Sequence, residues 1–496
     1  MTVWVPQREL CGLFYIVLMR FQLACAGGLC YTRSAYREGG YRMKPKSTIH
    51  LTTSQFILLG FLLVILAGSV LLVLPISAAD GQSVPYVDAL FTATTATCVT
   101  GLVTLPTVST WSAFGQAVIL LLIQIGGLGV VTIISWMMLL FHRRIGISTR
   151  LLIQDAFNLN TLSGLVRFVK KVLLGTLIVE GAGALAYMTV FVPQFGARGI
   201  WISIFNAVSA FCNAGIDIIS ENSLCAYARD PLINIVTCLL IVLGGIGYIV
   251  WWDVVRVLGL KRRGTPLRLW KRLTLQSKLA IFMTLLLIFG GAALLLIFEG
   301  NNPLTLGGMS TGEKLQAAIF QSVTTRTAGF ATVPQQALTD GGAIISLLLM
   351  FIGGSPAGTA GGIKTVTAAV LAATAFSVIK GRDNVNLYHR HISEQVIHKA
   401  AAVAAISFAT AFFSTVALAA VVDAPAIDIM FETVSATATV GLSRNLTPML
   451  NGAGKLIITA TMYFGRVGPI SLAFALSGRG KSTNMIKNPT EDLSVG

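Results

Sequence analysis

Long apolar runs separated by short polar connections dominate the chain. Six of them, residues 56–74, 117–141, 172–192, 233–252, 279–298 and 400–422, approach or exceed the roughly 20 residues that a helix needs to cross a bilayer core. Shorter apolar segments lie between the runs; each begins at a Phe and extends for about ten residues. These segments are too short to cross a membrane and too apolar to be ordinary loops. The pattern predicts an all-α polytopic membrane protein.

Four of the short segments share one pattern, in which Phe is followed by small and hydroxyl residues and then by Gly. They are residues 91–101, 205–215, 320–329 and 431–441, and successive final glycines are separated by 114, 114 and 112 residues. A second glycine-rich motif follows each, at 125–129, 243–247, 352–356 and 464–468. Such periodicity indicates repeated structural units. We expect four parallel helix–pore-loop–helix repeats around a central pore, with eight spanning helices.

The repeats divide the chain into domains. Repeat one is predicted at 43–145, repeat two at 146–260, repeat three at 261–382 and repeat four at 383–478, with a cytoplasmic tail at 479–496. The first 42 residues show no periodicity and match no signal or transit peptide. We expect residues 1–42 to be a non-native or disordered extension, with the true start at Met43.

Composition and charge support a membrane protein. Hydrophobic residues make up 54% of the chain and charged residues 11%, well below the roughly 25% charged residues of soluble proteins. The net charge of +16 would suit nucleic-acid binding only on a solvated basic face. Instead, the connections 141–171, 252–279 and 379–399 hold 18 Lys and Arg residues, whereas 77–113, 193–230, 299–340 and 422–452 hold 5. This asymmetry predicts a multi-pass protein in contact with lipid, with both termini cytoplasmic and no nucleic-acid partner.

The short Phe-led segments predict a cation pore. Each connects two helices whose adjoining ends lie on the outer face, so it must enter and leave from that side. Irregular backbone at membrane depth is tolerated where it lines a watery cavity. Four helix C-termini pointing at one axis favour a cation, and backbone carbonyls beyond them can replace its water shell. The final glycines suit this turn; an ordinary helix C-cap remains the alternative for any single repeat.

The predicted cation-coordinating residues are each final glycine and the two residues before it. They are Val99, Thr100, Gly101, Asn213, Ala214, Gly215, Thr327, Ala328, Gly329, Thr439, Val440 and Gly441.

A glycine-rich break interrupts the third repeat. It comprises Gly353, Gly354, Ser355, Pro356, Ala357, Gly358, Thr359, Ala360, Gly361 and Gly362. This composition does not sustain a helix, and a kinked helix facing lipid would leave backbone groups unpaired. A flexible loop inside the pore is the better interpretation.

Four charged residues lie within or beside the predicted spans. Arg466 occupies a position that is glycine in the other repeats, so it is a candidate electrostatic barrier or loop anchor, with snorkelling as the alternative. Lys364 ends the loop and could equally be an anchor on the cytoplasmic side. We expect Arg326 to point behind the glycine turns and to donate to loop carbonyls, and Glu180 to pair with a buried polar group.

Several motifs resemble the Trk/Ktr/HKT superfamily of potassium transporters, and most of all its bacterial KtrB/TrkH subunits, with KtrB favoured by the short ends. They lie at 97–102, 211–215, 324–330, 351–365, 435–442 and 465–469. The resemblance covers the chain from about Met43. It implies potassium-selective uptake across the bacterial cytoplasmic (inner) membrane, with Na+ as a candidate activator. It further implies a selectivity filter at the four glycines and a gate formed by residues 353–362 with Lys364 and Arg466. The implied assembly is a homodimer with a KtrA/TrkA-like cytoplasmic nucleotide-binding ring.

Other function classes fit less well. An alternating-access secondary cation transporter, the main alternative, would need inverted repeats and unwound spanning helices. An enzyme is not expected, because all five His residues lie at cytoplasmic ends, far from any Gly-flanked Ser. The string at 478–483 lacks the full phosphate-loop spacing, and the seven cysteines show no metal-ligand spacing. We therefore expect no cofactor on this chain and no metal beyond transported K+.

Overall fold

The computed structural model describes residues 52–140, 154, 164–262, 269–382 and 384–468. The predicted extension 1–42 and the tail 479–496 lie outside the described residues. Within them the chain is built from helices, and its only sheet is a hairpin of β1 (Asn386–Leu387) and β2 (Arg390–His391). The predicted all-α class is confirmed.

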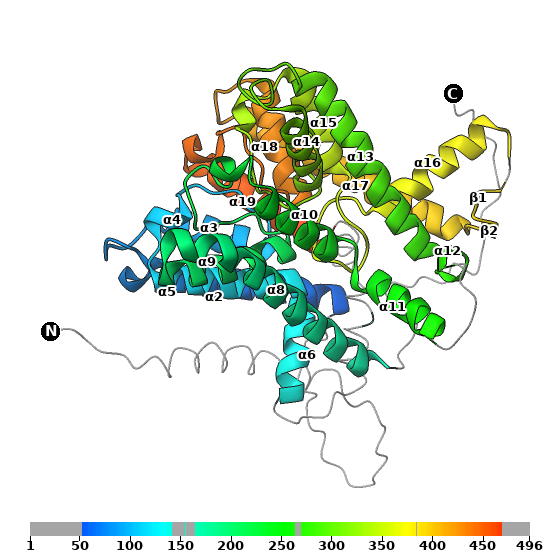
Figure 1. Ribbon diagram of the computed structural model, residues 1–496, viewed down its shortest axis with the longest axis horizontal. Helices are drawn as coiled ribbons and strands as arrows, with labels where there is room; N and C mark the ends of the chain where they lie inside the picture. The colour runs from blue at the N-terminus through cyan, green and yellow to red at the C-terminus, as the bar shows by residue number, and fades with distance from the viewer. Residues whose placement is uncertain (1–51, 141–153, 155–163, 263–268, 383, 469–496) are drawn as a thin grey trace, which may run out of the picture.

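The main helices form four groups with the same internal order (Figure 1). The first helices are α2 (Thr53–Val73), α8 (Leu165–Phe195), α13 (Leu275–Glu299) and α17 (Glu394–Ala419). The second helices are α3 (Tyr86–Cys98), α9 (Ala197–Cys212), α14 (Thr311–Thr324) and α18 (Ala426–Ala438). The third helices are α5 (Ala113–Leu128), α10 (Pro231–Gly245), α15 (Asp340–Phe351) and α19 (Gly452–Val467).

Further helices continue the first three groups or lie in the connections. They are α6 (Val130–Leu140), α11 (Tyr248–Arg262) and α16 (Thr365–Ile379), with the shorter α4 (Thr107–Thr110), α12 (Leu269–Arg272), η1 (Pro75–Ser77), η2 (Cys225–Tyr227), η3 (Gln335–Ala337) and η4 (Thr447–Met449).

The first helices are the full-length spans. Among the described residues, four helices are long and apolar enough to cross a membrane, or five if the pair α10 and α11 counts as one span. The prediction that each of the runs 117–141 and 233–252 forms one continuous helix is wrong. The chain breaks at Gly129 and Gly247, whose φ angles are 84° and 94°. The second break bends the α10–α11 pair by 96°. The number of eight spanning helices stays a prediction.

The second helices are longer than the predicted ten residues. They contain 13, 16, 14 and 13 residues, because each begins well before its Phe. Capping defines these starts. At α14, the Ser310 N–H donates to Glu313 Oε2 at 2.8 Å, and Ser310 Oγ accepts from the Glu313 N–H, which forms a capping box.

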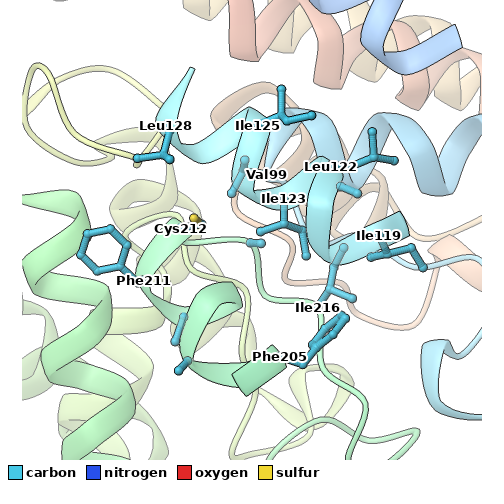
Figure 2. Close-up of a cluster of buried hydrophobic side chains, with 14 of the residues drawn as sticks. Val99, Ile119, Leu122, Ile123, Ile125, Leu128, Phe205, Phe211, Cys212 and Ile216 are labelled. Atoms are coloured by element: carbon cyan, nitrogen blue, oxygen red, sulfur yellow. The ribbon is translucent and has the colours of Figure 1, made fainter. Parts of the chain in front are cut away.

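Contacts between groups close a ring. The third helix of each group packs on the second helix of the next: α5 on α9, α10 on α14, α15 on α18, and α19 on α3. Figure 2 shows the first of these interfaces, where Ile119 and Ile123 of α5 face Phe205 of α9. Lipid is as apolar as these side chains, so close packing rather than exclusion of water stabilises such contacts.

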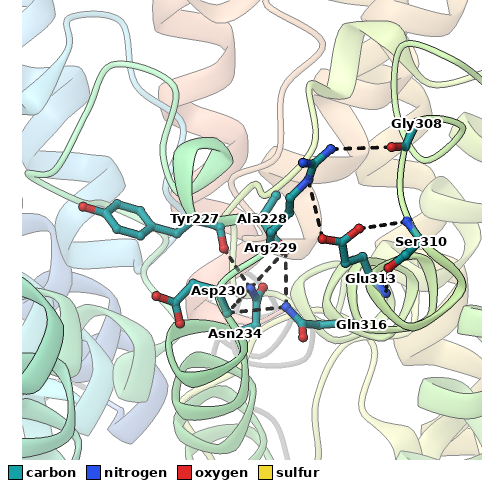
Figure 3. A network of polar contacts seen from close by, with 9 residues as sticks. All are labelled: Tyr227, Ala228, Arg229, Asp230, Asn234, Gly308, Ser310, Glu313 and Gln316. Atoms are coloured by element: carbon teal, nitrogen blue, oxygen red, sulfur yellow. Dashed lines mark hydrogen bonds and ion pairs between the residues drawn. The ribbon is translucent and has the colours of Figure 1, made fainter.

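A polar network reinforces the contact between the second and third groups (Figure 3). Asp230 caps α10 by accepting from the Leu232 N–H at 2.9 Å. Across the interface, Arg229 lies 3.7 Å from Glu313 of α14. Both side chains of this ion pair are partly exposed, so we expect it to orient the loop before α10 more than to stabilise the fold.

Candidate functional site

Each second helix is followed by a left-handed residue, which is the C-cap of α3, α9 and α18 and lies two residues past the C-cap of α14. Val99, Asn213, Thr327 and Thr439 have φ angles of 55°, 60°, 71° and 52°. A non-glycine residue in this conformation costs about 1 to 3 kcal/mol and persists only where its surroundings hold it. A backbone hydrogen bond supplies that restraint: the next N–H returns to the helix, as in Thr100 to Thr95 O at 2.9 Å and Val440 to Ser435 O at 2.8 Å.

A hydroxyl side chain near each helix end holds the segment after the turn. The Gly101 N–H donates to Thr95 Oγ1 at 2.9 Å, and the Gly441 N–H donates to Ser435 Oγ at 3.0 Å. In the other two groups the hydroxyl donates instead, from Ser209 to Ile216 O at 2.5 Å and from Thr324 to Phe330 O at 2.6 Å. These four hydroxyl residues are not among the site residues predicted from the sequence. Their repeated place, six or five residues before the glycine, was the available signal.

The four predicted glycines meet in a ring. A methyl group on Gly101 would lie 2.5 Å from Ala214 O, and one on Gly329 would lie 2.5 Å from Val440 O. Methyl groups on Gly215 and Gly441 would meet the carbonyl oxygens of Ala328 and Thr100. Each glycine therefore abuts the carbonyl that precedes the glycine of the next group, and the fourth returns to the first.

Only glycine fits this ring. Gly101, Gly215, Gly329 and Gly441 all have positive φ angles, of 99°, 63°, 85° and 96°. Glycine adopts such angles without strain, and any side chain would press on the neighbouring backbone. The structure thus brings all four predicted turns together around one axis.

A cavity of about 290 Å³ opens above the ring. All four glycines line it, together with the segments that follow them. The site therefore has a vestibule that leads to the ring.

The predicted loop 353–362 is a loop in the structure, between α15 and α16. Ser355 and Thr359 are fully buried. The Ser355 N–H donates to Gly245 O at 2.8 Å, and the Thr359 N–H donates to Gly244 O at 3.1 Å. The loop is therefore packed against α10 in the protein interior, and its backbone groups find protein partners rather than lipid.

The loop contacts glycine-bearing turns directly. The Gly361 N–H donates to Thr327 Oγ1 at 3.1 Å, and Thr359 Oγ1 donates to Phe211 O at 3.1 Å. A methyl group on Gly361 would lie 2.6 Å from Ala438 O and would also meet the Thr439 side chain. The glycine is needed for this approach, which places the loop against the turns of the third and fourth groups.

Three cationic side chains hold the loop. Arg466 of α19 donates through Nη1 to Thr359 O at 2.6 Å, and Lys364 Nζ donates to Ala360 O at 2.6 Å. Arg326 Nη2 donates to Gly353 O at 3.4 Å, and Gly353 is the first residue of the loop. Within the described part of the chain Arg466 forms no ion pair with a carboxylate. Backbone carbonyls are its partners instead.

Glu180 lies behind the turn of the second group. It accepts from Gln124 Nε2 at 3.2 Å, and Cys212 Sγ lies 3.8 Å from its other oxygen. The polar partners are therefore Gln124 and Cys212, whose thiol also lies 3.5 Å from Gln124 Oε1. Figure 2 shows Cys212 at the end of α9, beside the packed α5.

The second glycine motif has a packing role. Methyl groups on Gly126, Gly244 and Gly465 would collide with the carbonyl groups of Thr97, Phe211 and Thr437, at the ends of the second helices. The third helix of those three groups can therefore touch the end of its own second helix. This contact supports each turn from behind.

Comparisons with known proteins identify the relatives of this chain. A family model described as TrkH, cation transport protein, matches residues 41–484. The potassium/sodium uptake protein NtpJ of Enterococcus hirae is 37% identical over 92% of this chain and 99% of its own length. The Ktr system potassium uptake protein B of Bacillus subtilis is 38% identical over 90% of this chain and 98% of its own.

A solved structure has the same fold. The potassium transporter TrkH from Vibrio parahaemolyticus superposes with a TM-score of 0.69 at 16% identity, over 94% of this chain and 91% of that one. The family match and the two relatives cover nearly all of the sequence. The chain belongs to the TrkH family of cation transport proteins.

Proposed function

We propose that this chain carries K+ into a bacterial cell through the glycine ring, with residues 353–362 as the gate. The observation that carries the proposal is the ring itself, in which each filter glycine abuts a carbonyl of the next group. Carbonyl oxygens of Thr100, Ala214, Ala328 and Val440 are suited to replace water around a cation. The C-terminal ends of the second helices add a favourable potential without a formal charge. Relatives named as potassium uptake proteins support K+ as the ion.

Gating follows from the loop's position. Gly361 lies beside Thr327 and Thr439, directly against the turns. A loop at that place blocks the route of an ion, and Arg466 and Lys364 add positive charge. Release of these hydrogen bonds would open the route.

The proposal extends to the assembly and its setting. We place the protein in the bacterial cytoplasmic membrane with both termini inside, because Lys and Arg are concentrated in the alternate connections 141–171, 252–279 and 379–399. The proposal also includes a homodimer, a cytoplasmic nucleotide-binding ring and Na+ as activator, because the family resemblance implies them. The mass of the complex extracted from its native membrane tests the first two.

Flux through the purified full-length chain tests the central claim. The protein is reconstituted in K+-free liposomes, and tracer Rb+ uptake is measured with and without excess Na+. We expect saturable uptake that K+ competes with much better than Na+. A matched control carries Gly329→Val, whose side chain would enter the ring. Equal uptake by this control, or none by the wild type, would overturn the proposal.

A further inference from the structure

The vestibule above the glycine ring has unequal walls. Its lining includes the residues two and six positions after each glycine, which are Val103, Asp217, Ala331 and Ser443, and Thr107, Glu221, Gln335 and Thr447. In both sets the second group alone supplies a carboxylate. No Lys, Arg or His is among the residues that line this cavity in the described part of the chain. The vestibule is therefore negative, and its charge lies on one side.

Asp217 is held in place at the floor of this cavity. Its side chain accepts from the Ile219 N–H at 3.3 Å, and the residue is only 9% exposed. The preceding Ile216 is tied to α9, since its carbonyl accepts from Ser209. The carboxylate thus stays fixed two residues beyond Gly215. Glu221, by contrast, is exposed and accepts from Ser109 at 3.2 Å.

A fixed charge in a cavity acts more strongly than the same charge on an open surface. Protein walls of low dielectric focus its field and raise the local concentration of counter-ions. An exposed carboxylate such as Glu221 is screened by salt within a distance of about 8 to 10 Å. Asp217, buried beside the ring, is screened much less.

We infer that Asp217 sets the affinity of the pore for the entering cation, by holding a partly hydrated monovalent cation over the ring. The inference rests on the proposed cation flux and adds the residue that governs entry. Asp217 contributes no ring carbonyl, so its charge changes capture rather than the preference among monovalent cations.

The test is the concentration dependence of Rb+ uptake by the full-length chain in liposomes. Asp217→Asn keeps an oxygen that can accept from Ile219 but removes the charge. We expect the KM to rise about threefold to tenfold at low ionic strength, with the maximal rate nearly unchanged. The matched control is Asp80→Asn, an exposed carboxylate between α2 and α3 that does not line the vestibule. It should leave the KM unchanged, and Glu221→Gln should raise it less than Asp217→Asn does.

A second measurement needs no variant. The KM of the wild type should rise when ionic strength is increased with the salt of an impermeant organic cation, and this dependence should be shallower in Asp217→Asn. If the KM changes neither in Asp217→Asn nor with ionic strength, the inference is overturned, whereas the proposed cation flux is not affected. Wild-type liposomes without flux would overturn the proposed function and the inference together. If Asp217→Asn fails to insert, the salt dependence of the wild type decides.

Discussion

Arg466 and Thr359 are joined by a hydrogen bond across 107 residues of sequence, from Nη1 to the carbonyl oxygen at 2.6 Å. The same guanidinium donates through Nη2 to Gly126 O at 2.5 Å. One side chain therefore connects α19, the loop 353–362 and the end of α5. The rigid fork of donors in arginine suits such a bridge, whereas lysine offers only a point charge. The equivalent positions Gly127 and Gly245 carry no side chain at all.

Replacing Arg466 with Gln should accelerate uptake. If a cation passes about 6 Å from the guanidinium at an effective dielectric of about 20, the repulsion is roughly 3 kcal/mol, equivalent to about a hundredfold in rate. Loss of the bond to Thr359 would also free the loop. Rb+ uptake in liposomes measures the rate, and competition with Na+ should show an unchanged preference. Arg466→Lys should keep part of the barrier. A variant that fails to insert or assemble would make Arg466 a structural residue.

Deleting residues 357–361 should raise flux and weaken regulation by the proposed cytoplasmic nucleotide-binding ring. The deletion removes the loop carbonyls that Arg466 and Lys364 bind. The shortened loop can still close, because Ile352 and Ile363 already pair as a bridge. Thr359→Ala, which removes only the side-chain bond to Phe211, should have a much smaller effect. Wild-type flux in a correctly inserted deletion variant would argue against a gate.

The sequence was sufficient to predict the four turns and the loop, but not the breaks after α5 and α10. The turns recur at a fixed period, and the loop composition is incompatible with a helix. Glycines in an apolar run, by contrast, can lie inside helices, as Gly126 and Gly127 do in α5 and Gly244 and Gly245 do in α10. Gly247 breaks its helix because of a distant contact: the Tyr248 N–H donates to Ala357 O at 2.9 Å rather than within its helix. Only the folded chain reveals that partner.

The four hydroxyl anchors were missed for a related reason. Ser and Thr in a helix usually bond to the carbonyl three or four residues earlier, as Thr94 does with Leu90 at 2.7 Å. Nothing local distinguishes Thr94 from Thr95. Only the position relative to the glycine, compared across repeats, separates them.

Gly101→Ser should reduce the preference for K+ over Na+. The new side chain would start 2.5 Å from Ala214 O, and a φ of 99° strains any residue but glycine. The ring must therefore shift, which changes the field at the ion. Competition between Rb+ and Na+ uptake measures the preference. Gly81→Ser is the matched control, since Gly81 has a φ of 72° and open space around it. An equal preference in both variants would contradict the filter assignment.

Thr95→Val tests whether the hydroxyl anchors shape the filter. Valine has nearly the same shape but cannot accept the hydrogen bond from the Gly101 N–H. An unpaired buried N–H costs about 1 to 3 kcal/mol, and the backbone can avoid that cost by rotating the peptide at the ring. Thr94→Val is the control. It removes the hydroxyl that donates to Leu90 O, but this carbonyl can still accept from a backbone N–H of α3.

We expect both variants to insert, and Thr95→Val alone to lower the preference for Rb+ over Na+ by about tenfold, the effect of roughly 1.4 kcal/mol. Selectivity and thermal stability are measured on the same purified samples, so a filter effect can be separated from a folding effect. A change in thermal stability without a change in preference would make Thr95 a helix-end support only. Equal losses of preference in the two variants would show that the whole end of α3, rather than the bond to Gly101, positions the ring.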